Sequence, residues 1–163
     1  MNRDLPSGLR IAIVWLLIGT ALFLGVQWWQ HRASQTRFSS DGGIIEIRRG
    51  PDGHYHWPGT INGRAVDFLV DTGATGTAIS AALARELGLE SIGQVRSSTA
   101  GGVVTGQIML ADITLRGGIR VERMRVTALP ALGERPLLGM NVLGRLGWQQ
   151  RDGVLIIDAG ARH

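Results

Sequence analysis

The 163-residue chain contains no cysteine and no lysine. The missing thiols exclude disulfide bonds, thiolate zinc sites and a cysteine nucleophile. The missing lysine argues against phosphoaspartyl chemistry, which would also need further acidic residues. The chain is too short for two-lobed or cofactor-rich architectures, which need roughly 250 residues or more. One ordinary domain with an appendage is therefore expected.

Charged residues make up only 18% of the chain, and all of the basic ones are arginine. The net charge of +4 and the pI near 11.1 suggest a nucleic-acid partner. Most of the excess lies in residues 1–37, where four arginines accompany one aspartate, so residues 38–163 carry only +1. Arg120, Arg123 and Arg125 have no aromatic residues beside them for base stacking. We interpret them as a solvated strand face and expect no nucleic-acid partner.

One long apolar run covers residues 11–29 and contains no charged residue. As a helix it would be about 28 Å long, close to the hydrocarbon thickness of a bilayer. Trp28 and Trp29 suit a membrane interface. We therefore expect an uncleaved transmembrane anchor at 11–29, between an N-terminal flank at 1–10 and a polar tether at 30–43. A cleaved signal peptide and a buried core helix are the alternatives.

Residues 44–163 are expected to form one mainly β domain, because short apolar runs alternate with turn signals. Asn62-Gly63 separates two such runs and is a strong hairpin signal. Ser80 is expected to cap a short helix that ends before Gly88, and Met140 to begin a second one that ends at 146. The predicted strands cover residues 54–61, 64–70, 94–98, 103–115, 119–129 and 154–158.

The most specific chemical signal is Asp71-Thr72-Gly73, directly after the apolar run 64–70. A carboxylate in this place is partly desolvated, and Thr72 supplies a hydroxyl beside it. Gly73 lets the backbone turn tightly enough for its amide to approach the carboxylate. This combination can hold one ionised oxygen next to a reacting water. The tripeptide alone also occurs in ordinary turns, but the strand before it and the helix after it favour a functional site.

The chain resembles the retropepsin-like aspartic proteases in three elements that occur in the family's order. Residues 70–74 match the catalytic motif, an apolar strand followed by Asp-Thr-Gly-Ala. Residues 137–143 match the second signature, two apolar residues and a glycine before a short helix. Residues 98–103 lie where the family has its flap, a glycine-bearing hairpin that closes over substrate. With the apolar run and tether, the chain looks like a bacterial membrane-bound subgroup of this family.

The resemblance implies a closed β-barrel or sandwich domain and an endopeptidase that hydrolyses polypeptides without a cofactor or metal. Two carboxylates of such an enzyme share a proton, one activating water while the other polarises the carbonyl. A single motif per chain implies a homodimer with one Asp71 from each copy. It would lie in the bacterial inner membrane with the domain on the periplasmic side. The resemblance assigns catalysis to Asp71, Thr72 and Gly73, substrate binding to Ala74, Thr99, Ala100, Gly101 and Gly102, and support of the catalytic loop to Leu138 and Gly139.

Ala74 stands where two-lobed relatives have serine or threonine, and it has no hydroxyl to donate to the carboxylate. Activity is therefore expected at weakly acidic to neutral pH, with pKa values that belong to the carboxylate pair. Asp158-Ala159-Gly160 imitates the motif in outline but lacks the threonine. We interpret residues 154–158 as a terminal strand, which in retropepsin-like dimers helps to form the interface.

Other interpretations remain for several residues. Residues 71–75 also fit the Asp-x-Gly-x-Thr pattern of actin-like kinases, although that fold needs a second lobe. His54 and His56 would lie on one face of a strand, but no third metal ligand has a persuasive spacing, so surface histidines are preferred. Trp57 and Trp148 are interpreted as packing residues. A non-catalytic retropepsin-like dimerisation or peptide-binding module is the alternative from a different functional class.

Overall fold

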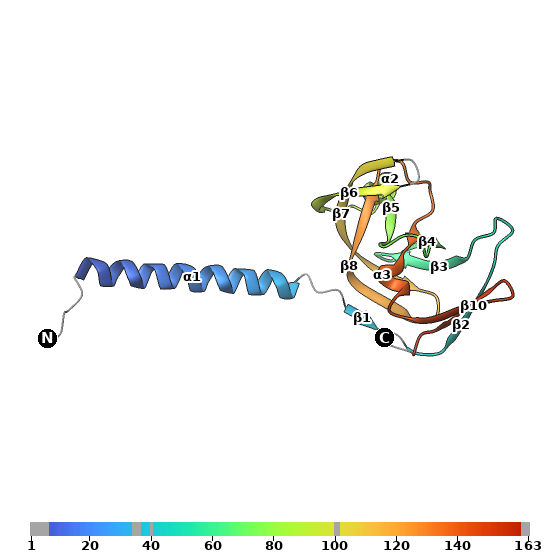
Figure 1. The fold of residues 1–163 in the computed structure, drawn as a ribbon, viewed down its shortest axis with the longest axis horizontal. Helices are drawn as coiled ribbons and strands as arrows, with labels where there is room; N and C mark the ends of the chain where they lie inside the picture. Colours follow the sequence, from blue (N-terminus) through green and yellow to red (C-terminus); the bar gives the residue numbers. More distant parts are fainter. Residues whose placement is uncertain (1–6, 34–36, 40, 100–101, 161–163) are drawn as a thin grey trace. The chain divides into compact units, whose positions relative to one another are not determined.

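The structure, a computed structural model, describes residues 7–33, 37–39, 41–99 and 102–160 (Figure 1). The chain forms two compact units, Met1–Gln35 and Thr36–His163. The first unit contains one helix and the second contains two sheets with two short helices. Each unit is described by itself.

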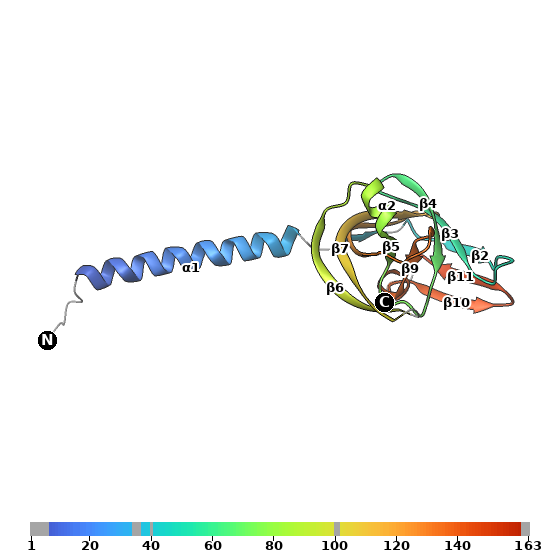
Figure 2. The ribbon, with the colours of Figure 1, turned by 90° about the horizontal axis from the view of Figure 1, so that it is seen from above.

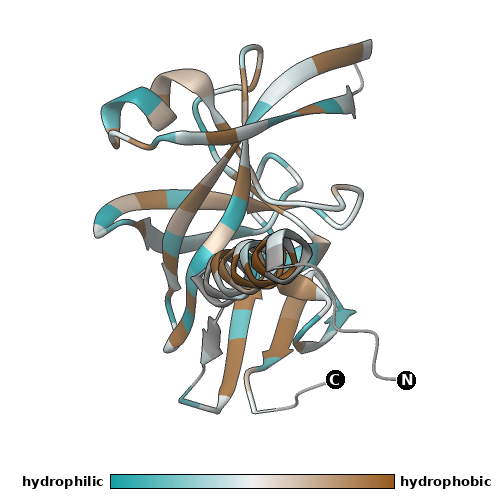
Figure 3. Cartoon of the chain, turned by 90° about the vertical axis from the view of Figure 1, so that its left-hand side faces the viewer, coloured by the Kyte–Doolittle hydropathy of each residue, from teal (hydrophilic) through white to brown (hydrophobic). Residues whose placement is uncertain are grey.

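The N-terminal unit contains helix α1, Ser7–Ala33, which includes the apolar run 11–29. Large apolar side chains are exposed along it, among them Trp15 and Leu16 at 68% and 69%, and brown segments are visible on it in Figure 3, which views it almost end-on. The expected helix is therefore present. In the part of the chain that the structure describes, no helix is both long and apolar enough to cross a membrane. The predicted transmembrane span is not supported.

The second unit is built on an eight-stranded sheet that closes into a barrel (Figure 1). Closure comes from an additional pairing between β7 and β8, which are neighbours in the chain but not in the linear strand order. The expected mainly β fold with a closed barrel is confirmed. The strands follow the order β1 (Arg37–Ser39), β8 (Ile119–Leu129), β5 (Ala78–Ser80), β9 (Leu137–Leu138), β4 (Arg64–Val70), β3 (His56–Ile61), β7 (Gly102–Leu115) and β6 (Ser91–Thr99).

A smaller three-stranded antiparallel sheet has the order β10 (Gly147–Arg151), β11 (Val154–Asp158) and β2 (Ile44–Arg48). Figures 1 and 2 both place this sheet away from the β6–β7 hairpin, with β3 and β4 between them. The short helices are α2 (Ala81–Glu86), which follows β5, and α3 (Met140–Leu143), which follows β9. The chain thus passes from a strand of the barrel into each helix.

Local sequence signals explain several of these elements. Asn62 and Gly63 both have positive φ, at 49° and 82°, and connect β3 to β4 as the hairpin signal predicts. The hydroxyl of Ser80 accepts a hydrogen bond from the amide of Leu83 at 3.1 Å and caps α2 as expected. Helix α3 was predicted to end at 146. It ends at Leu143, and Gly144 forms its C-cap.

The predicted tether at 30–43 contains regular structure. Its first residues belong to α1, and β1 pairs with β8 so that Phe38 lies opposite Val121. The polar composition of this segment hides the strand, because an edge strand of three residues needs no apolar pattern of its own. Strands β2, β5, β9 and β10 are also absent from the predicted strands. Most of the barrel interior is filled by aliphatic and aromatic side chains, among which the largest fully buried are Trp57, Phe68, Ile61, Ile79, Ile113, Leu115 and Ile119.

The long strand β7 has two different surroundings along its length. From Gly102 to Gly106 it pairs with β6 alone, whereas from Gln107 onward it also pairs with β8. Its last residues pair with β3 as well. Strand β7 therefore contributes its outer part to the β6–β7 hairpin and its inner part to the wall of the barrel.

Candidate active site

Asp71 lies at the carboxyl end of β4, between the strands β3 and β9. Its amide donates to the carbonyl of Leu138 at 3.0 Å, which fixes the backbone where the strand ends. The amide of Gly73 donates to Oδ1 of Asp71 at 2.8 Å, the approach expected from the tight turn. Among the described residues, Oδ2 of this half-buried carboxylate has no hydrogen-bond partner. One oxygen is therefore held by the loop and the other is available to a ligand or water.

The loop at residues 71–76, which the resemblance predicts to be the catalytic loop, is held in place by the segment that joins β9 to α3. Met140 donates its amide to the carbonyl of Ala74 at 2.8 Å, and Asn141 donates to that of Thr75 at 3.1 Å. Leu138 is fully buried. Gly139 lies against Ala74 and Gly76, and the carbonyl of Leu138 accepts from Asp71, while support of the loop by these two residues stays a prediction.

Gly139 occupies a place with no room for a side chain. A Cβ atom built on it would collide with the backbone of Gly76 and would lie 2.8 Å from the carbonyl oxygen of Ala74. Real Cβ atoms do not approach backbone atoms so closely, so a larger residue would push the two segments apart. The glycine of the second signature is therefore required by the close contact with the catalytic loop.

Thr77 is a structural residue of the site that sequence reasoning missed. Its side chain is buried, with 1% exposure. The hydroxyl donates to Oδ1 of Asn141 at 2.9 Å and accepts from the amide of Gly139 at 3.3 Å. The pairing joins residues 64 positions apart, a contact that no local pattern in one sequence can indicate. Thr77 links the end of the catalytic loop to the start of α3.

Replacing Thr77 with valine should destabilise the domain by about 2 kcal/mol, because the buried amide of Gly139 and the side chain of Asn141 each lose a partner. Serine at position 77 keeps the hydroxyl and should cost about 1 kcal/mol or less, for the lost methyl group alone. Urea unfolding of the two variants measures the difference. Equal stability of the valine and serine variants would show that the hydroxyl contributes nothing.

The predicted flap lies at the end of the β6–β7 hairpin, where Thr99 is paired with Gly102. The hairpin itself is present as expected. Ala100 and Gly101, predicted at its tip, lie outside the described residues. Beside the tip, Val103 is 61% exposed, so the hairpin offers an apolar side chain to solvent.

Asp158 has the same local geometry as Asp71, since its Oδ1 accepts from the amide of Gly160 at 2.9 Å. It ends β11, however, and so belongs to the three-stranded sheet rather than to the barrel strands that carry Asp71. The terminal strand preferred for residues 154–158 is confirmed.

The remaining candidates have structural surroundings of their own. Among the described residues, no group of three or more His, Cys, Asp or Glu side chains has an arrangement that could hold a metal ion. Trp57 is buried and donates to the carbonyl of Arg116 at 2.9 Å, as expected for a packing residue. Trp148 is 38% exposed and lies outside the core, contrary to expectation. Arg120, Arg123 and Arg125 are exposed on β8.

A closed barrel with an Asp-Thr-Gly loop braced by a Leu-Gly-helix segment defines a retropepsin-like aspartic protease domain. A family model described as gag-polyprotein putative aspartyl protease matches residues 57–145, which is more than half of the chain. The chain belongs to this family of retropepsin-like aspartic proteases.

The chain is also similar to individual proteins. The crystal structure of a retropepsin-like aspartic protease from Rickettsia conorii superimposes with a TM-score of 0.58 at 23% identity, covering 75% of this chain and 94% of that one. EIAV protease complexed with the inhibitor HBY-793 gives 0.48 at 22% identity, over 58% and 89% of the two chains. The uncharacterized protein RP867 of Rickettsia prowazekii (strain Madrid E) is 28% identical over 156 residues, 90% of this chain and 67% of its own length. The similarity to the Rickettsia conorii structure supports the barrel fold.

Proposed function

We propose that the chain is an aspartic endopeptidase that hydrolyses peptide bonds with a water activated by Asp71 of two copies. The observation that carries the proposal is the state of the Asp71 carboxylate. Its Oδ1 is held by the amide of Gly73 and its Oδ2 has no partner among the described residues. An oriented carboxylate with one available oxygen can accept a proton from a water molecule placed beside it.

The second carboxylate is supplied by another copy of the chain. General base and general acid must act together on the water and the amide carbonyl, and two carboxylates that share one proton do this. Each chain has one Asp-Thr-Gly sequence, and the similar turn at Asp158 ends a strand of the other sheet. A two-fold homodimer therefore brings Asp71 of each copy to the axis.

The residues around Asp71 have three proposed roles: orienting the carboxylate, contacting the substrate and supporting the loop. Thr72 and Gly73 orient the carboxylate and brace the two copies against each other. Ala74 and the flap residues Thr99, Ala100, Gly101 and Gly102 contact the polypeptide substrate. Leu138 and Gly139 support the loop from behind, which agrees with the hydrogen bond between Leu138 and Asp71.

Mixing of subunits tests the shared site. Wild-type chain and the Asp71→Asn variant are combined in equal amounts under conditions in which two different affinity tags prove that mixed pairs form. If each site needs both carboxylates, cleavage falls to about one quarter of that of the same total amount of wild-type chain, since random pairing leaves a quarter of the dimers intact. A fall to only one half would show that each chain acts alone.

The same experiment separates the peptidase from a non-catalytic dimerisation or peptide-binding module. Mixed pairs that form readily while the wild-type chain cleaves no peptide at any pH from roughly 3 to 8 would favour the module. Cleavage that depends on the fraction of wild-type chain would favour the peptidase.

A position in the bacterial inner membrane, with the domain on the periplasmic side, is a separate proposal. It rests on the sequence of residues 11–29 alone, because no membrane-spanning helix is found in the described residues. Separation of the membrane and soluble fractions of cells that produce the chain tests it, and recovery in the soluble fraction would contradict it.

A further inference from the structure

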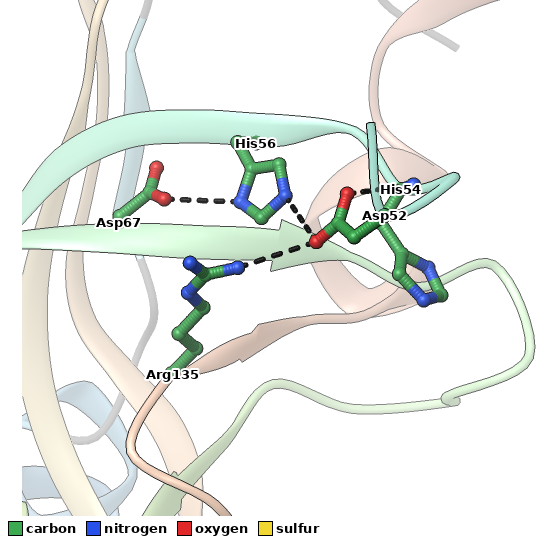
Figure 4. A network of polar contacts seen from close by, with 5 residues as sticks. All are labelled: Asp52, His54, His56, Asp67 and Arg135. Carbon is green, nitrogen blue, oxygen red and sulfur yellow. Dashed lines mark hydrogen bonds and ion pairs between the residues drawn. The ribbon is translucent and has the colours of Figure 1, made fainter. Parts of the chain in front are cut away.

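A cluster of four charged or titratable side chains, Asp52, His56, Asp67 and Arg135, lies beside β3 and β4 and is referred to as the His56 cluster (Figure 4). The imidazole of His56 lies between two carboxylates. Its Nε2 is 2.8 Å from Oδ2 of Asp52, and its Nδ1 is 3.0 Å from Oδ2 of Asp67. Arg135 donates to the same oxygen of Asp52 at 3.3 Å. The cluster joins the loop before β3, the β3–β4 hairpin and the segment that leads into β9.

The geometry of the ring indicates its protonation state. A neutral imidazole has one N–H group, whereas an ionised carboxylate only accepts hydrogen bonds. Both contacts of His56 can therefore be hydrogen bonds at the same time only when both ring nitrogens carry a proton. The ring of His56 is 22% exposed, whereas the side chains of Asp52 and Asp67 are 41% and 46% exposed, so water reaches the carboxylates more easily than the ring. When His56 loses a proton, one of its two carboxylates loses its donor.

The surroundings keep Asp52 ionised. The amide of His54 donates to Oδ1 of Asp52 at 3.2 Å, and this hydrogen bond is the main cause that lowers the pKa of Asp52 below its ordinary value. Desolvation acts in the opposite direction, and smaller lowering contributions come from the ring and charge of His56 and from the charge of His54. A lowered pKa means that Asp52 stabilises the folded state above its unfolded pKa and loses this contribution as the pH falls through its folded pKa. Asp52 therefore remains an ionised acceptor for His56 and Arg135 until the pH is acidic.

The cluster is adjacent to the backbone that holds the catalytic strand. The amide of Val70 donates to the carbonyl of Tyr55, the residue before His56, at 2.9 Å. The amide of Leu69 donates to the carbonyl of Pro136, the residue after Arg135, at 2.8 Å. These two bonds hold the residues directly before Asp71 on both sides of β4. The contact between Arg135 and Asp52 ties together the same two flanking segments.

We propose that His56 is a positioning residue whose protonated ring clamps Asp52 and Asp67 and so keeps the two segments beside β4, and with them Asp71, in the catalytic arrangement. Loss of the ring proton releases one carboxylate and loosens the end of β4. Cleavage is then expected to decline as the pH rises and the ring loses its proton. This inference rests on the proposed peptidase function for its kinetic consequence only.

The structural part is tested without any substrate. The ring of His56 is titrated by NMR in histidine-labelled chain, and hydrogen-exchange protection factors of the amides of Leu69, Val70 and Asp71 are measured across the same pH range. Protection is expected to fall about tenfold with the midpoint of the ring titration, since a hydrogen bond to a charged group is lost. Protection that stays constant through the titration of His56 would overturn the proposal.

Variants sharpen the test. His56→Gln has donor and acceptor groups but no titrating charge, so the protection of the three amides is expected to be about tenfold lower than in wild type at weakly acidic pH and to show no step. His54→Gln is the matched control, because no hydrogen bond of the cluster uses the His54 side chain. It should behave as wild type. Asp67→Asn serves if His56→Gln fails to fold, and it should shift the ring titration to lower pH. An unchanged titration in Asp67→Asn would contradict the clamp.

Kinetics connect the cluster to catalysis. In His56→Gln, kcat at weakly acidic pH should fall about tenfold with KM changed less than twofold, and the decline that follows the His56 titration should disappear. If hydrogen-exchange protection changes with the NMR titration of His56 but the wild-type chain cleaves no peptide, the peptidase proposal is rejected and the positioning role of His56 is retained. Cleavage with constant protection would reject the clamp and keep the peptidase.

Discussion

Replacement of Asp71 with asparagine is expected to reduce peptide cleavage by at least about 10³-fold, which leaves activity at the limit of detection. Asparagine preserves the volume of the side chain, and its carbonyl oxygen can still accept the hydrogen bond from Gly73 that holds Oδ1 at 2.8 Å. It cannot take a proton from water, and proton transfer by a positioned side chain contributes roughly 10²–10⁴-fold to such reactions. In a homodimer the change removes both carboxylates of the site at once.

Asp158→Asn provides a matched control within the same chain. Asp158 also precedes a glycine by two positions and accepts the amide of Gly160 at 2.9 Å, so the substitution makes the same local change in the other sheet. It is expected to leave cleavage within about twofold of wild type. Hydrolysis of a fluorogenic peptide library by purified 163-residue chain measures both variants. Equal loss of activity in the two variants, or equal retention in both, would contradict the role of Asp71.

Replacement of Gly139 with alanine is expected to destabilise the domain by about 3 kcal/mol or more. The added methyl group would collide with the backbone of Gly76 and the carbonyl of Ala74, neither of which can rotate away as a side chain would. The backbone hydrogen bonds from Met140 and Asn141 into the loop would lengthen with the separation of the segments. Cleavage should therefore be lost even in the fraction that remains folded.

Gly76→Ala separates this collision from a general cost of adding a methyl group to the loop. Gly76 has no atom within 4 Å of a built Cβ and is not at positive φ, so alanine fits there without strain. Its stability is expected to lie within about 0.5 kcal/mol of wild type, because a methyl group that meets no atom within 4 Å creates neither a collision nor a cavity. Urea unfolding measures both. A tolerated alanine at 139 would show that the β9–α3 segment can move away from the catalytic loop freely.

Much of the barrel could be predicted from local pattern. The β3–β4 hairpin follows from Asn62-Gly63, and the cap of α2 follows from Ser80, because turn and cap chemistry act within a few residues. Strand β5 and the pairing of β1 with β8 could not be predicted. Strands β1 and β5 have three residues each, and their pairing partners on β8 are far away in the sequence.

The candidate site divides in the same way. Asp71 and Gly139 lie in short motifs whose spacing carries the family resemblance, and the contacts of both residues agree with that resemblance. Thr77 could not be identified from the sequence, because the side chain that its hydroxyl contacts, Asn141, is 64 positions away. The sequence led us to interpret His56 as a surface residue, because its neighbours in the chain do not indicate a contact with Asp67 across the hairpin.

The two surroundings of β7 have a mechanical consequence. Residues 102–106 pair only with β6, so this outer part of the hairpin can swing as a two-stranded lever without breaking any hydrogen bond of the closed barrel. At about 3.3 Å per residue the lever is roughly 16 Å long. Gly106 lies where this outer part joins the barrel. A Cβ there would meet Thr127, Leu129 and the carbonyl of Ala128, so the backbone of Gly106 packs closely against β8. The outer part of the hairpin can thus bend while the strand pairings of β4, which precedes Asp71, stay in place.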